Sequence, residues 1–389
     1  MKINKDKVLK ITVCIISVCL SAVILFFFSD AVISFAAQAV MVNARSFLPV
    51  KGLKPNEAFY SATQEATTAE TTAKPITTVP ATSTTKPVST EKAASAAVEL
   101  KFNRTDEDIL SLIKEAEKEG KKDKKDGKIS EYSYINDGVT DKYGKVRVKN
   151  VNNKTDINIK KLLETKSEVK VNKDEPAVLI FHTHTTETYE ILDRGFYAVG
   201  HKTRSNDSRI NMVRVGEETV KEIENAGYKV IHDKVIHDSS YNGAYAHSRK
   251  SVEAYLKEYP SIKIVLDLHR DAIQRSDGTK IKPVATVDGK KAAQIMIISG
   301  CQEEGGPIEG FPDWKKNLVF AVELQDTLEN LFPGITRPLY FSPRKYNMDL
   351  TTCSLLVEIG SDANTLDEAV YTGRCLGRAV SKILERYEE

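Results

Sequence analysis

Residues 177 to 187 read Ala177-Val178-Leu179-Ile180-Phe181-His182-Thr183-His184-Thr185-Thr186-Glu187, and this stretch decides how the sequence is interpreted. It begins as a short apolar run, which is typical of a strand buried on both faces of a sheet. It continues with two histidines and a carboxylate where such a strand would end. Because ligands of open α/β sheets bind beyond the carboxyl ends of the strands, this stretch is the first half of a candidate site.

Similar apolar runs predict four more strands, and amphipathic stretches between them predict helices. The five strands are expected over 177–181, 228–231, 262–268, 294–298 and 354–359. One helix is expected to end at Gly227, and others to cover about 243–258, 314–331 and 366–386. The pair Asp288-Gly289 predicts a hairpin between 284–287 and the strand at Gln294, which makes one strand pair antiparallel. We therefore predict an α/β domain with a mostly parallel central sheet flanked by helices.

The N-terminal part of the chain has a different composition. No charge occurs between Ile11 and Ser29, and four lysines precede this run, which predicts a transmembrane helix with a cytoplasmic N-terminus. The alternative is a signal peptide cleaved after Ala37-Gln38-Ala39, and either interpretation exports the rest of the chain. From about Ser61 to Ala97, Thr, Ala, Ser and Pro dominate, which predicts a disordered linker.

These differences divide the chain into four parts. Residues 1–43 form the cytoplasmic tip and transmembrane anchor, 44–98 the disordered linker, 99–170 a poorly ordered neck, and 171–389 the α/β domain. A net charge of only +2 does not favour nucleic acid as a partner. Five scattered cysteines without a CxxC pair predict neither a disulfide framework nor a structural zinc module.

Three predicted strands contain, or are followed by, polar side chains that could act in catalysis or metal binding. His184 and Glu187 follow the first, and His269 lies at the end of the third; together they match the ligands of a catalytic zinc with an open position. Glu358, within the apolar last strand, would be a desolvated general base. Arg270 would steady a substrate carboxylate or the developing oxyanion.

Each of these residues also has an ordinary interpretation. A histidine at a strand end is more often a hydrogen-bonded structural residue than a ligand, and Glu358 could instead form an ion pair with Arg270 or Arg337. Cys353 opens an apolar strand and is expected to be inert.

Several ordered motifs from about 150 to 389 resemble the stage II sporulation protein P family. The motifs are Ile180-Phe181-His182-Thr183-His184-Thr185-Thr186-Glu187-Thr188-Tyr189, Val215-Gly216-Glu217, Ile231-His232-Asp233, Leu266-Asp267-Leu268-His269-Arg270-Asp271-Ala272 and Leu356-Val357-Glu358-Ile359-Gly360, with Tyr245 and Ser248 between them. The family is also built with an N-terminal transmembrane anchor and a variable linker.

The resemblance implies a peptidoglycan hydrolase that acts in engulfment during endospore formation. It implies N-acetylmuramoyl-L-alanine amidase and stem-peptide endopeptidase activities, stage II sporulation proteins D and M as partners, and a fold similar to the zinc-dependent cell-wall amidases. The protein would then be a single-pass protein of the cell membrane with its C-terminal domain outside the cytoplasm. His184 and His269 match the family's essential histidines and Glu358 its catalytic glutamate, whereas His182 is the less certain ligand of the tandem motif.

One position departs from the related amidases, which take a carboxylate ligand from the start of the next helix. This chain has Arg209-Ile210-Asn211 there. The third ligand is then Glu187, Asn211 or a water, and Glu187 is favoured because a neutral amide oxygen is a poor zinc ligand. The departure also leaves two other functions open: a wall-binding scaffold with a degenerate site, and a metallopeptidase that acts on proteins.

Overall fold

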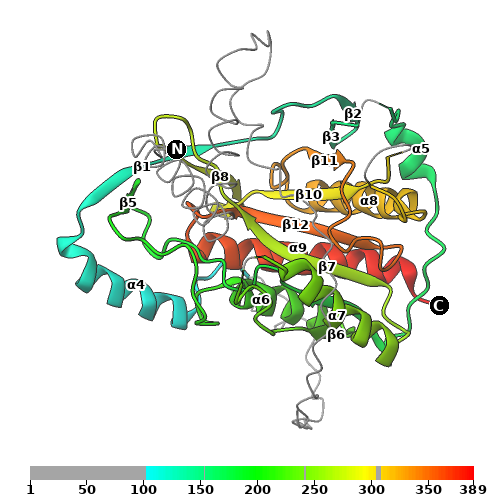
Figure 1. The fold of residues 1–389 in the computed structure, drawn as a ribbon, viewed down its shortest axis with the longest axis horizontal. Helices are drawn as coiled ribbons and strands as arrows, with labels where there is room; N and C mark the ends of the chain where they lie inside the picture. Colours follow the sequence, from blue (N-terminus) through cyan, green and yellow to red (C-terminus); the bar gives the residue numbers. More distant parts are fainter. Residues whose placement is uncertain (1–101, 153, 241, 304–307) are drawn as a thin grey trace, which may run out of the picture. The chain divides into compact units, whose positions relative to one another are not determined.

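The computed structural model describes residues 102–389 apart from 153, 241 and 304–307, and the predicted anchor and linker lie outside this part (Figure 1). Within the described residues, no helix combines the length and the apolar character that a membrane span requires. The expected anchor therefore stays a prediction.

An eight-stranded sheet forms the centre of the fold, in the order β2-β3-β11-β10-β12-β7-β4-β6 (Figure 1). The strands are β2 Asp141–Tyr143, β3 Val146–Asn150, β4 Pro176–Phe181, β6 Lys229–His232, β7 Ile264–Asp271, β10 Ile295–Gly300, β11 Leu339–Ser342 and β12 Ser354–Ser361. Neighbours are parallel from β12 through β7 and β4 to β6, and again from β10 through β11 to β3; β10 with β12 and β2 with β3 are antiparallel. The predicted mostly parallel sheet is confirmed.

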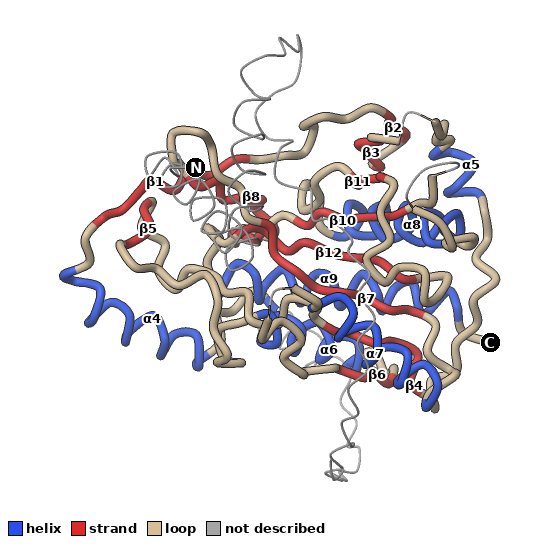
Figure 2. The backbone as a smooth tube through the Cα atoms, viewed as in Figure 1, coloured by secondary structure: helices blue, strands red, loops and turns tan. Residues whose placement is uncertain are grey.

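Helices cover both faces of this sheet, because the strands point apolar side chains to both sides (Figure 2). The helices α6 Met212–Asn225, α8 Trp314–Leu331 and α9 Leu366–Tyr387 share one core with side chains such as Ile180, Leu266 and Val357. The alternate residues Leu179 and Val265 point the other way and pack with α7, Ala244–Glu258. The five predicted strands and four predicted helices lie where they were expected, with small differences at their ends.

A second sheet has the order β5-β1-β8-β9. Its strands are β5 Phe196–Ala198, β1 Lys125–Tyr132, β8 Lys280–Val287 and β9 Lys290–Ala293. Asp288 and Gly289 join β8 to β9 with φ angles of 47° and 79°, as a two-residue hairpin requires. The predicted hairpin is confirmed, but its second strand is β9 and not the strand at Gln294.

The described residues of the expected neck are part of this fold. They form α4 (Glu107–Glu119), a short 3-10 turn (Gly120–Lys122), α5 (Ile159–Glu164) and strands β1 to β3. Strand β3 pairs with β11 and β1 pairs with β8, so both sheets depend on this segment. The expectation of poor order over 99–170 was therefore wrong for the described residues of this segment, 102–152 and 154–170, where short strands rich in charged residues gave a weak sequence signal.

Candidate active site

The predicted site residues come from three adjacent strands of the central sheet. His184 and Glu187 follow β4, His269 lies near the end of β7, and Glu358 lies in β12. The register of β12 and β7 places Glu358 directly beside His269. Because neighbouring strands lie about 4.8 Å apart and paired residues share a face, these two side chains lie on the same side of the sheet. The structure thus brings together residues that are far apart in the sequence; His184 and Glu358, the two most distant, are separated by 174 positions.

Aromatic packing fixes the two histidines. The ring centroids of His184 and His269 are 5.2 Å apart and the rings are nearly perpendicular. Tyr245, from the first turn of α7, packs edge-on against His184 at 5.7 Å and stacks with His269 at 6.3 Å. Its ring also stacks with Tyr346 at 5.0 Å. The sequence did not predict a role for Tyr245 in the site, because no carboxylate or histidine pattern around it resembles a ligand or catalytic motif.

Glu187 approaches the second histidine. Its Oε2 atom lies 3.8 Å from Nδ1 of His269 and accepts a hydrogen bond of 3.2 Å from the backbone N–H of Arg270. Its Oε1 atom lies 3.4 Å from a guanidinium nitrogen of Arg204. This carboxylate is therefore buried against positive charge, within reach of one predicted ligand.

Glu358 is a buried carboxyl group with an unused acceptor. In the part of the chain that the structure describes, its Oε2 atom has no hydrogen-bond partner and no Lys or Arg nitrogen lies within 4.0 Å. Burial first, and then the carboxylate of Asp271, raise the pKa of Glu358 to about 8. The alternative of an ion pair with Arg270 or Arg337 is not observed, since Arg337 binds Asp271 at 2.9 Å instead.

Arg270 uses its side chain on the protein itself. Its guanidinium group donates to the backbone carbonyls of Thr188 at 3.1 Å and Thr203 at 2.8 Å, and the residue is buried. It fastens the segment that carries Glu187 to β7. Its contact with substrate stays a prediction.

His182 points away from the pair formed by His184 and His269. Its Nδ1 atom lies 3.1 Å from the carbonyl oxygen of Leu268, and its Nε2 atom lies 2.9 Å from Nε2 of His232. Burial lowers the pKa of His182 to about 4 and that of His232 to about 2, so both rings are neutral at pH 7. A structural contact explains His182 without a role as a ligand.

Asn211 is used as a helix cap. Its side-chain oxygen accepts from the N–H of Val213 at 3.0 Å, and its amide nitrogen donates to the carbonyl oxygen of Ser205 at 3.1 Å. Both groups satisfy the backbone around the first turn of α6. Both polar groups of Asn211 are thus bound to the backbone, which leaves it unsuited to the role of third ligand that the sequence left open for it.

The donor set of His184, His269 and Glu187 fits zinc in its chemistry, but the three ligand atoms do not converge. Among the described residues, one other group of His, Cys, Asp or Glu side chains has converging ligand atoms. It consists of Glu131, Asp193 and Glu368, whose ligand atoms all lie within 4.8 Å of one another. Those three carboxylates surround the buried ammonium group of Lys282, at 3.4, 2.9 and 2.7 Å respectively. An internal cation explains that cluster, and a side-chain rearrangement would be needed for the predicted trio to hold an ion.

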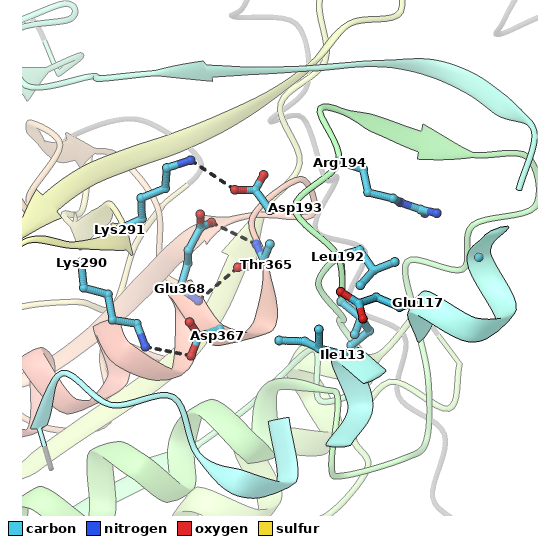
Figure 3. Close-up of a pocket in the computed structure, with 12 residues that line it drawn as sticks. Ile113, Glu117, Leu192, Asp193, Arg194, Lys290, Lys291, Thr365, Asp367 and Glu368 are labelled. Carbon is cyan, nitrogen blue, oxygen red and sulfur yellow. Dashed lines mark hydrogen bonds and ion pairs between the residues drawn. The ribbon is translucent and has the colours of Figure 1, made fainter. Parts of the chain in front are cut away.

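A cavity of about 590 Å³ lies apart from these histidines, lined by residues of α4, the segment after Glu190, β9 and the start of α9 (Figure 3). Figure 3 shows the ion pairs Lys290–Asp367 and Lys291–Asp193 at this cavity. The cavity includes none of the predicted site residues.

Sequence reasoning also missed Asp267, a 2% exposed carboxylate on the same face of β7 as His269. Its Oδ1 atom lies 2.8 Å from Nε2 of His269. The signal was present in the Asp-x-His pattern inside an apolar run, since a charge in a strand buried on both faces needs a partner.

Comparisons with known proteins give the family. The model of the stage II sporulation protein P family matches residues 59–381. Stage II sporulation protein P of Bacillus subtilis (strain 168) is 28% identical over 207 residues, which cover 50% of this chain and 48% of that protein; the chain therefore spans about half the length of this relative.

Two solved amidase structures show a distant likeness to this chain. The N-acetylmuramoyl-L-alanine amidase AmiC2 of Nostoc punctiforme has 11% sequence identity and a TM-score of 0.34, and the match covers 56% of this chain and 98% of that chain. The CwlD amidase from Clostridioides difficile, in complex with the GerS lipoprotein, has 12% identity and a TM-score of 0.35, and the match covers 54% of this chain and 98% of that chain. The family match alone covers most of the chain, and by it this chain belongs to the stage II sporulation protein P family.

Proposed function

We propose that the protein is a peptidoglycan hydrolase that acts in engulfment during endospore formation. It hydrolyses the amide between N-acetylmuramic acid and L-alanine, and also stem-peptide cross-links. The family provides the setting of sporulation. The observation that carries the chemistry is the placement of Glu358 beside His269, with His184 packed against the same imidazole.

In this proposal His184, His269 and Glu187 would hold a zinc ion once their side chains have rearranged to bring the three ligand atoms together. When bound, zinc would act as a Lewis acid on the scissile carbonyl. The two imidazoles would supply nitrogen donors, that of His269 once its ring has lost the proton that Asp267 stabilises, and Glu187 the negative charge that Asn211 lacks. Arg204 and the N–H of Arg270 orient the Glu187 carboxylate.

Glu358 moves the proton in this reaction. A water attacks the amide carbon, Glu358 accepts the proton that the water loses, and it returns a proton to the amine as the C–N bond breaks. The Oε2 atom without a hydrogen-bond partner can accept the proton, and the pKa of Glu358, raised to about 8, favours its return to the amine near neutral pH. The segment from 1 to 43 would anchor the protein in the cell membrane with the hydrolase outside, where stage II sporulation proteins D and M would be its partners.

The test uses the purified full chain on isolated peptidoglycan, with muropeptide and amine release as readouts. We expect His184→Ala, His269→Ala and Glu358→Gln each to lower the rate at least about 100-fold, and a chelator to do the same. His247→Ala is the matched control, because His247 is exposed and its ring contacts His237 but none of the predicted site residues. Wild-type rates in Glu358→Gln would refute the mechanism.

A second candidate is a wall-binding scaffold without turnover, which the separation of the three ligand atoms favours. A scaffold would sediment with peptidoglycan, release nothing, and contain no stoichiometric zinc. The third possibility, a metallopeptidase, would cleave an unfolded protein substrate and leave peptidoglycan intact.

A further inference from the structure

The geometry points to Asp267 as the residue that positions His269, at the end of a buried chain of hydrogen bonds that reaches helix α7 and the turn at Asn347. This inference rests on the proposed function for its consequence in catalysis. The contacts that carry it are independent of any bound metal.

The first link joins the carboxylate to the imidazole. Oδ1 of Asp267 lies 2.8 Å from Nε2 of His269, a hydrogen-bonding distance, although the N–H is not aligned for a linear bond. On the other side of the ring, Nδ1 lies toward Glu187. A carboxylate at Nε2 favours the tautomer with its proton there, which leaves Nδ1 as the donor atom on the side of Glu187.

The second link fixes the carboxylate. The backbone N–H of Thr183 donates to Oδ1 of Asp267 at 2.8 Å, and the hydroxyl group of Thr183 donates to Oδ2 at 2.7 Å. Both oxygens are therefore held by a residue that is itself fully buried at the end of β4. Asp267 cannot rotate without breaking these bonds.

The third link extends to the elements around the site. The hydroxyl oxygen of Ser248, in α7, lies 2.8 Å from that of Thr183, and the side-chain amide of Asn347 donates to Ser248 at 3.1 Å. The same amide donates to the carbonyl oxygen of Tyr245 at 3.0 Å. Since Thr183 gives its proton to Asp267, it can only accept from Ser248, whose hydroxyl group also lies 3.2 Å from the carbonyl oxygen of Tyr245.

The chain thus couples the orientation of the imidazole to the aromatic residue that covers it. Tyr245 stacks on His269, and Asn347 holds the backbone of Tyr245. Asn347 has a left-handed φ of 58°, a conformation that a fixed hydrogen-bonding partner helps to maintain.

The primary test is the tautomer of His269 in the wild-type full chain. Labelling with ¹⁵N-histidine gives signals from only seven residues, and the absence of one in His269→Gln assigns the signal. At alkaline pH, where the ring is neutral, we expect the proton on Nε2. A proton on Nδ1 in the wild-type protein overturns the inference, whether or not any variant folds.

Two variants test the consequence. We expect Asp267→Asn to lower zinc affinity by 10- to 100-fold, measured by chelator competition, and to shift His269 toward the other tautomer. Thr183→Val, which keeps Asp267 but removes the hydroxyl donor, should have a smaller effect in the same direction.

Asp233→Asn is the matched control. Asp233 is an equally buried carboxylate that lies 2.9 Å from Nε2 of His237 and accepts from a serine hydroxyl group, yet it contacts no predicted ligand. It should leave the zinc affinity and the His269 signal unchanged; equal losses in both aspartate variants would overturn the specific role of Asp267. A wild-type protein that shows the Nε2 tautomer but cleaves no peptidoglycan would refute the proposed function while supporting the positioning role.

Discussion

At the scale of single residues, the burial of Glu190 makes the stability of this fold depend on pH. The side chain is 3% exposed and its Oε1 atom lies 3.4 Å from Nδ1 of His201. Burial raises the pKa of Glu190 from 4.5 to about 7, against the opposing effects of Arg194 and Lys280. Because the folded state binds this proton more tightly than the unfolded state, stability is lost as the pH rises from about 4.5 through 7.

We predict that Glu190→Gln stabilises the protein at pH 8, by about 2 kcal/mol, and has little effect at pH 4.5. Chemical denaturation of both proteins at the two pH values measures this difference. Glu115→Gln, an exposed carboxyl group on α4, is the control and should change nothing at either pH. An equal effect of Glu190→Gln at both pH values would show that the gain has another cause.

The site itself was only partly predictable at this scale. His184, His269 and Glu358 stood out because polar residues interrupt apolar strands, and the strand order then places them together. The roles of Thr183 and Asn347 could not be seen, because uncharged hydroxyl and amide side chains in loops leave no pattern until their partners are known.

At the scale of elements, helices α6 and α9 pack so closely that α9 requires glycine at two positions. A Cβ atom on Gly373 would lie 2.7 Å from the carbonyl oxygen of Val215, and one on Gly377 would lie 2.6 Å from that of Thr219. Carbonyl oxygens of a helix backbone cannot move aside without shifting the helix. These two glycines set the distance between α6 and α9.

We predict that Gly377→Ala destabilises the protein by about 1 to 3 kcal/mol, as overpacking does, although alanine favours a helix by about 1 kcal/mol over glycine. Thermal unfolding measures the change. Lys382→Ala, on an exposed position of the same helix, is the control. A more stable Gly377→Ala protein would show that α6 can shift away from α9 at little cost, and would contradict this prediction.

Elements were predictable where one periodicity dominated. Helix α8 occupies the predicted 314–331, and the buried strands of the central sheet differ from prediction by a few residues. Strand β1, with the sequence Lys-Asp-Gly-Lys-Ile-Ser-Glu-Tyr, buries only Ile129 and could not be recognised from apolar periodicity. Its position depends on pairing with β5 and β8, which no local pattern encodes.

At the scale of the whole described fold, the segment before α4 closes the face formed by α6 and α9. The carboxylate of Asp106 binds Arg214 and Arg374, two buried arginines that also share Glu218. Phe102 packs with Phe332 and Tyr371. The chain around residues 102–106 thus belongs to the core.

We predict that Asp106→Ala lowers the free energy of unfolding by about 1 to 3 kcal/mol, because two arginines in a poorly solvated site lose a shared partner. Asp141→Ala, a half-buried carboxylate in β2 that forms only a local bond with Thr140, is the control. Denaturant titration compares them, and equal stabilities would show that Glu218 alone is sufficient for both arginines.

The pairing of β3 with β11 also bears on when this protein can fold. Its partners Val148 and Leu339 are about 190 residues apart in the chain, and contacts of such long range slow folding. The last helix, α9, supplies much of the core on one face of the sheet. A nascent chain whose α9 has not yet left the ribosome therefore lacks the helix that this core needs, and the core on that face cannot be completed until α9 has emerged.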